Sequence, residues 1–250
     1  MRAYLTLTRR ELAGFFYSWI AYVVIAGAAF LMGLSYVVML AKLNVAPTVM
    51  PVTEIFLHTQ LPWLILLFSP PVITMRLFAL EKSSGTFETL MTTPVSDLAV
   101  VLAKFSAGLI LYWIAWLPLL GFMVILRYAA HDASFLDAGT LAATFLGLLL
   151  LGTLYMSVGC FASSLTSNQI VAAMITFAIG LGLFILSIAA DQLAADKSWA
   201  TATLNYICLT AHMEDFTQGM VDTRCLVFYL TVSAFFLFLT HRVVQSRRWK

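Results

Sequence analysis

Long intervals without a charged residue constrain this chain more than any other feature of its sequence. A helix needs about 20 apolar residues to cross a hydrocarbon core of roughly 30 Å, at about 1.5 Å per residue. Each interval therefore marks at least one candidate membrane span. The intervals are bounded by Glu11 and Lys42, Glu54 and Arg76, Lys104 and Arg127, Asp137 and Asp191, and Arg224 and Arg242.

The interval from Asp137 to Asp191 is too long for one helix. Its middle reads Ser163-Ser164-Leu165-Thr166-Ser167-Asn168-Gln169, a cluster of turn-forming residues, so it predicts two spans joined by a tight hairpin. Runs such as residues 146–151, Leu-Gly-Leu-Leu-Leu-Leu, lack the alternation of barrel strands. We therefore expect an all-α, polytopic membrane protein forming a single transmembrane domain over residues 1–250. The six predicted helices lie near 20–41, 56–79, 100–126, 138–162, 169–190 and 225–244.

The composition excludes a water-soluble protein. Hydrophobic residues make up 62% of the chain and charged residues 10%, against about 25% charged residues in soluble domains. The formal net charge of +2 is too small to predict binding to nucleic acid. The lipid bilayer is the expected surrounding.

The distribution of Lys and Arg predicts the orientation. If the N-terminus, the 80–99 loop, the 163–168 hairpin and the C-terminus share one side, that side carries ten of the fourteen basic residues. We expect this side to be the cytoplasm and the location to be the bacterial cytoplasmic (inner) membrane. The ten residues are Arg2, Arg9, Arg10, Arg76, Lys82, Lys104, Arg242, Arg247, Arg248 and Lys250.

Two segments on the cytoplasmic side resemble amphipathic helices rather than spans. Residues 1–19 place an apolar stripe opposite basic residues, which is typical of an interfacial helix. In the 80–99 loop, Phe87, Leu90 and Met91 follow helical spacing and Pro94 ends any helix. A short helix at 86–93 could offer this apolar ridge to a cytosolic partner or lay it against lipid.

The segment 191–224 is expected to form short helices on the extracytoplasmic side, before the last span. It is too short to form a core of its own and must pack on the spans. Its residues His212, Glu214 and Asp215 are more typical of a solvated loop than of a metal site, so no metal is expected. Cys208 and Cys225 could pair in an oxidising compartment.

The second span contains Pro62, Pro70 and Pro71. Each proline removes a backbone donor, so the span is either a hinge or cavity-lining helix, or a static kink buried in the bundle.

The chain lacks the sequence motifs of an energy-converting or hydrolytic site. It contains no phosphate-binding loop of the form Gly-x-x-x-x-Gly-Lys-Ser/Thr, no His-Glu-x-x-His and no Gly-x-Ser-x-Gly. The span interiors also lack the ionisable residues of ion-coupled transporters. We expect no enzymatic activity and no cofactor in this chain, so a pump of this kind would take its energy from a partner.

Two stretches resemble a known family. The first is Thr74-Met75-Arg76-Leu77-Phe78-Ala79 followed by Glu81-Lys82, Gly85-Thr86, Glu88, Leu90 and Pro94-Val95-Ser96, with Lys104 in the third span. The second is Ala211-His212-Met213-Glu214-Asp215-Phe216, then Gly219 and Asp222 before Tyr229. Both are similar to the membrane subunits of ABC type-2 exporters, especially the six-span permeases related to gliding-motility-associated transporters.

The resemblance implies a complex of two permease halves and two cytosolic ATPase subunits that hold ATP and Mg. The second half would be another copy or a paralogue, with a periplasmic accessory protein as a further candidate partner. Residues 1–19 would be the connecting helix and 86–93 the coupling helix that docks on the ATPase. The docking residues implied are Glu81, Gly85, Thr86, Phe87, Glu88, Leu90 and Met91.

An alternative from a different class is a non-transporting membrane anchor that transmits ATPase motion to a periplasmic or motility assembly. A polar cavity at the interface between the two halves would favour the exporter, and a sealed interface filled with Leu and Phe would favour the anchor.

Overall fold

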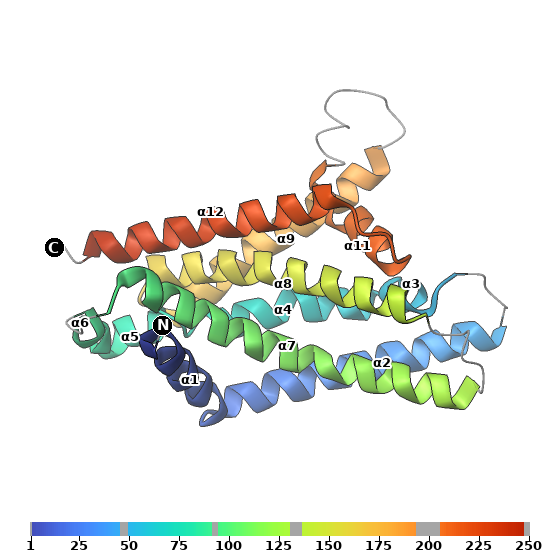
Figure 1. Ribbon diagram of the computed structural model, residues 1–250, viewed down its shortest axis with the longest axis horizontal. Helices are drawn as coiled ribbons and strands as arrows, with labels where there is room; N and C mark the ends of the chain where they lie inside the picture. Colours follow the sequence, from blue (N-terminus) through green and yellow to red (C-terminus); the bar gives the residue numbers. More distant parts are fainter. Residues whose placement is uncertain (1, 46–49, 92–94, 131–136, 194–205, 248–250) are drawn as a thin grey trace.

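The computed structural model describes residues 2–45, 50–91, 95–130, 137–193 and 206–247 (Figure 1). In these ranges all regular secondary structure is helical, and six helical segments are long and apolar enough to cross a membrane. The predicted fold class and the six predicted spans are therefore confirmed. The long helices are α2 (Trp19–Val45), α4 (Gln60–Thr74, continued toward Ser84), α7 (Asp97–Ala130), α8 (Ala138–Leu165), α9 (Gln169–Leu193) and α12 (Thr223–Arg247).

Helix α8 is the centre of the bundle. Two thirds of its most apolar window is buried (67%), whereas the corresponding window of α9 is 22% buried. Glycines bring the neighbouring helices close to α8: a Cβ atom at Gly152 would overlap the Tyr112 ring of α7, and one at Gly159 would overlap the Thr74 side chain of α4. The outer helices leave large apolar side chains exposed, as expected for lipid contact; they include Phe30, Val37, Ile170, Met174 and Phe235.

The two ends of the bundle differ. At one end lie the chain termini, α1 (Arg2–Phe16), α5 (Ala79–Ser84), α6 (Thr86–Met91) and the turn between α8 and α9 (Figure 1, left). At the other end lie α3 (Val52–Leu57) and α11 (Leu209–Thr217). The predicted hairpin is present: α8 ends at Leu165, and Asn168 Oδ1 accepts the N–H of Ile170 at the start of α9.

The second span has different boundaries from those predicted. The sequence suggests one helix over 56–79, but α3 ends at Leu57, α4 begins at Gln60, and α4 ends at Thr74. A bend over residues 75–78 then precedes α5. Helix α4 itself has 15 residues and therefore rises about 22 Å.

The N-terminal amphipathic segment is helical, as predicted, over Arg2–Phe16. Helix α1 packs along α7, and the hydroxyl groups of Tyr4 and Ser106 are hydrogen-bonded at 2.7 Å. The apolar stripe of α1 thus includes the buried Phe15, which belongs to the core. Trp19, the last residue of the predicted segment, lies at the start of α2 and is 85% exposed.

The segment before the last span is helical over part of its length and packs on the bundle, as expected, but its histidine is not solvated. Residues Leu209–Thr217 form helix α11, and His212 is buried with 7% of its surface exposed. Its ring makes edge contacts with Phe228 and Tyr229 of α12. The apolar spacing of Leu209, Met213 and Phe216 drives this burial, because it gives α11 a face that packs on α8. Cys208 and Cys225 are buried and not bonded to each other.

Candidate functional site

Helices α5 and α6, within the loop predicted to meet a cytosolic partner, are fixed to the bundle by two serines at the end of α8. Ser163 Oγ accepts the backbone N–H groups of Phe78 and Ala79, both at 3.1 Å. These are donors at the start of α5 that have no partner inside their own helix. Next to it, Lys82 Nζ donates to the carbonyl of Ser164, where the negative end of the α8 dipole favours a cation. Neither serine was among the site residues predicted from the sequence.

A cluster of ion pairs around the buried Lys104 joins α5 to α1 and α7. Lys104 Nζ lies 2.8 Å from Glu81 Oε1 and 3.1 Å from Glu11 Oε2, and only 2% of its side chain is exposed. Arg10 Nη2 lies 2.7 Å from Glu11 Oε1 and 3.6 Å from Glu81 Oε1. The hydrogen bond with Glu11 raises the pKa of Arg10, although partial burial acts in the opposite direction. The cluster contains two cations and two carboxylates, so its charges balance.

Glu81 therefore has an internal partner, whereas the sequence-based expectation placed it among the docking residues. Its side chain is 17% exposed and faces Lys104. The docking role of Glu81 was implied by the family resemblance, and the sequence offered no sign that Glu11, Glu81 and Lys104 come together. The Lys104 ammonium also lies 5.6 Å from the centre of the Phe78 ring, a cation–π distance that suits a desolvated lysine.

Helix α6 follows α5 after a sharp turn at Gly85. Its φ of +73° lies in the left-handed region, which glycine adopts without a Cβ clash. Phe87 is 7% exposed and packs into the core, with Lys82 Nζ 5.5 Å above its ring. Thr86 and Glu88 are exposed. Phe87 thus anchors α6 on the bundle, and Glu88 points a negative charge away from it.

Part of the predicted coupling helix lies outside the residues that the structure describes. Helix α6 extends from Thr86 to Met91, but the side chains of Leu90 and Met91 and the whole of residues 92–94 are not among the described features.

The three prolines of the second span are all buried. Pro62 lies in the first turn of α4, where a missing N–H breaks no intrahelical bond. Pro70 and Pro71 lie inside α4 and deprive the carbonyls of residues 66 and 67 of their helical donors. Thr74 Oγ1 donates to the Pro70 carbonyl at 2.8 Å, one turn before α4 ends. The weakest part of α4 is therefore adjacent to the bend that leads to α5.

The model of the ABC-2 family of transporter proteins matches residues 53–218, about two thirds of the chain. The chain belongs to the ABC-2 transporter family. It is thus the membrane, or permease, subunit of an ABC transporter, a type of domain that has no ATPase site and typically binds no cofactor. ABC permeases pair with an ATPase subunit. No curated protein matches this sequence.

The matched region of the ABC-2 permease includes α5, α6, the central helix α8 and α11. Helix α1, with Arg10 and Glu11, lies outside it. The ion-pair cluster therefore connects the family region with a preceding helix. Within the described residues, no group of three or more His, Cys, Asp or Glu side chains could hold a metal ion.

Proposed function

We propose that this ABC-2 permease is one half of an ATP-driven exporter. Its cytosolic ATPase would dock on α5 and α6. The observation that supports this assignment is the attachment of α5 to two long helices, through Ser163 of α8 and Lys104 of α7, together with the burial of Phe87 of α6. A short surface helix that was free to pivot could not transmit a push. One clamped to α7 and α8 moves those spans with it.

The proposed docking surface consists of Gly85, Thr86, Glu88, Leu90 and Met91. Glu88 supplies an exposed charge for the partner. Glu81 and Phe87 hold the docking surface on the bundle, through the ion pair with Lys104 and through burial of the Phe87 ring. This proposal places the end with both termini in the cytoplasm, in agreement with the excess of Lys and Arg there.

The proposed motion runs from α6 through α5 into the bundle. ATP-driven closure of the partner would push α6, and the Lys104–Glu81 pair would carry the push to α7. Pro70 and Pro71 would let α4 bend next to α5. Moving a gate from 1:99 to 99:1 requires about 5.5 kcal/mol of differential binding, which a nucleotide-driven interface can supply.

The complete exporter would contain a second permease half, either another copy or a paralogue. Within the ABC-2 family we assign the chain to the permeases related to gliding-motility-associated transporters, on the motif around residues 74–96. An anchor that transmits force without transport would use the same docking surface, and transport measured with the assembled complex separates the two.

The docking surface is tested by co-purification of the full-length chain with its ATPase from mild detergent. Glu88→Lys and Leu90→Asp should each abolish recovery of the ATPase while membrane insertion remains normal. The matched control is Glu214→Lys, the same change of charge at an exposed position at the other end of the bundle. If both loop variants retain the ATPase at wild-type stoichiometry, the assignment is wrong.

A further inference from the structure

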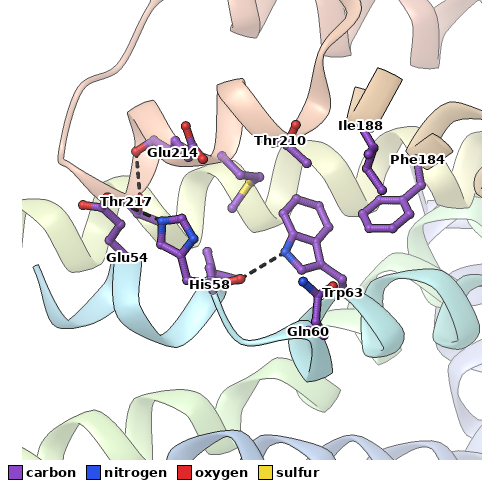
Figure 2. Close-up of a pocket in the computed structure, with 11 residues that line it drawn as sticks. Glu54, His58, Gln60, Trp63, Phe184, Ile188, Thr210, Glu214 and Thr217 are labelled. Carbon is purple, nitrogen blue, oxygen red and sulfur yellow. Dashed lines mark hydrogen bonds and ion pairs between the residues drawn. The ribbon is translucent and has the colours of Figure 1, made fainter. Parts of the chain in front are cut away.

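A cavity of about 230 Å³ lies at the end of the bundle opposite α5 and α6. Its walls come from α3, α4, α9 and α11 (Figure 2). Hydrogen bonds between these elements hold the walls: Thr53 Oγ1 donates to the Thr217 carbonyl at 2.9 Å, and the N–H of Leu209 donates to Ser187 Oγ at 2.9 Å. The short helices α3 and α11 are thereby fixed to each other and to a span, so the cavity is preformed.

One wall of the cavity is aromatic. The ring of Trp63 lies 5.3 Å from that of Phe184, with an angle of 40° between their planes (Figure 2). The indole N–H of Trp63 donates to the Leu57 carbonyl at 3.0 Å, which uses its single polar group and fixes the ring. A ligand therefore meets the π-face or edge of this ring, not a hydrogen-bond donor. Such faces attract cations.

The polar wall is acidic. Glu54 and Glu214 line the cavity, and none of the described lining residues is a Lys or Arg. The one basic group there is His58, whose Nε2 lies 3.6 Å from Glu54 Oε1 and which neutralises that carboxylate only when protonated. Lys42 lines a second cavity that shares only His58 with this one.

Glu54 is the decisive residue because it is 8% exposed. A carboxylate removed from water is costly unless a cation or several hydrogen bonds compensate it. The ion pair that the structure gives Glu54 is with an imidazole whose own side chain is 49% exposed. A positively charged ligand inside the cavity would add to the compensation that His58 provides.

We propose that this cavity binds a small organic cation, an ammonium group with an apolar substituent. The carboxylates of Glu54 and Glu214 would attract the charge, and Trp63 and Phe184 would contact the apolar part. The volume is below the roughly 300–1,000 Å³ of sites for drug-sized ligands, so it suits a headgroup or a simple amine. This inference depends only on the end of the bundle that carries α3 and α11, and it is independent of the proposed ATPase docking.

The test measures binding of choline to the purified full-length chain in a non-ionic detergent, by titration calorimetry or saturation-transfer NMR. The neutral isostere 3,3-dimethylbutanol has nearly the same shape without the charge. Choline should bind at least tenfold more tightly than the isostere. Equal binding of the two, or no binding of choline, would overturn the proposal.

Substitutions of the lining residues test whether choline binds in this cavity. Glu54→Gln keeps the size of the side chain and should weaken choline binding about tenfold or more, and Trp63→Leu should weaken it as well. Glu88→Gln, an equal change at the opposite end, should bind choline like the wild type. Should Glu54→Gln fail to fold, judged by its gel-filtration profile, Glu214→Gln provides the same test from the other wall. Undiminished binding in a folded carboxylate variant counts against the proposal.

The natural ligand would be either the headgroup of a lipid or a free amine, and the composition of the surrounding bilayer distinguishes the two. In nanodiscs of dioleoylphosphatidylcholine, a lipid headgroup that occupies the cavity would block choline binding, whereas nanodiscs of dioleoylphosphatidylglycerol would leave it intact. Equal binding in the two lipids would indicate a free amine as the ligand. Either result supports a cation site, and absence of choline binding in phosphatidylglycerol nanodiscs contradicts it.

Discussion

Lys104 Nζ lies 2.8 Å from Glu81 Oε1, and this ion pair joins the long helix α7 to the short helix α5. The burial of this ion pair determines how much it contributes to the stability of the folded protein. An exposed pair contributes about 0–1 kcal/mol, whereas loss of one partner of a buried pair costs about 3–5 kcal/mol because a charge is left without compensation. Only 2% of the Lys104 side chain is exposed, and it has a second carboxylate partner in Glu11.

The first prediction concerns this lysine. Lys104→Met should lower the free energy of unfolding by about 3–5 kcal/mol, because it leaves Glu11 and Glu81 without the buried cation. Thermal unfolding in a non-ionic detergent measures the loss. The exposed Lys42, near the end of α2, provides the control: Lys42→Met should change stability by no more than about 0.5 kcal/mol. Similar losses in the two variants would contradict a special role for the cluster.

A second prediction concerns Ser163. Ser163→Ala removes the acceptor of the Phe78 and Ala79 N–H groups, and an unsatisfied buried donor costs about 1–3 kcal/mol. We expect hydrogen exchange over residues 78–84 to accelerate about tenfold or more, since 1.4 kcal/mol corresponds to a factor of ten. Ser83→Ala is the control, because the Ser83 hydroxyl is exposed and donates to the Leu80 carbonyl within its own helix. Unchanged exchange in Ser163→Ala would show that the serine does not hold α5.

The six spans could be predicted from the sequence because length, hydropathy and the absence of charge are properties of each segment by itself. The break between α4 and α5 could not be predicted in this way, because it depends on a contact with a distant part of the chain. The hydroxyl that caps α5 belongs to a residue 85 positions later in the chain, and serine is common enough that no local pattern marks Ser163. The prolines indicated an irregular second span without locating its end, since α4 continues past Pro71 to Thr74.

The candidate site shows the same division. The apolar spacing of residues 86–91 predicted a helix there, and α6 is present. Its burial pattern depended on tertiary contacts: Phe87 packs inward beneath Lys82, although sequence alone gave the ring an outward role. His212 likewise appeared solvated beside two acids, but its burial follows from the packing of α11 on α8 and α12.

A third prediction uses two glycines. A Cβ atom at Gly159 of α8 would overlap the side chain of Thr74, whereas one at Gly182 of α9 would meet no atom within 4 Å. Gly159→Ala should therefore destabilise the bundle by about 1–3 kcal/mol through overpacking. Gly182→Ala should be neutral or stabilising by up to about 1 kcal/mol, because alanine loses less backbone entropy in a helix. Thermal unfolding of the two variants side by side gives the comparison, and a reversed order would refute the close packing of α4 on α8.

The last prediction concerns pH and His212. Burial lowers the pKa of His212, and the carboxylates of Asp215 and Asp222 oppose this shift without cancelling it. The folded protein therefore binds the proton less readily than the unfolded chain, where the pKa of histidine is about 6.5.

The sign of the effect follows from this difference. Above about pH 7 both states hold a neutral imidazole and His212 has no influence on the pH dependence. As the pH falls through about 6.5, the unfolded chain takes up a proton first, so stability decreases, by at most about 1.4 kcal/mol per pH unit from this group. The decrease ends once the pH is below the pKa of the folded state. Unfolding measured between pH 7.5 and 5 should show a shallower decline in His212→Gln than in His241→Gln, which removes a histidine of α12 at the other end of the bundle. Equal slopes in the two variants would mean that the buried imidazole is not the group responsible.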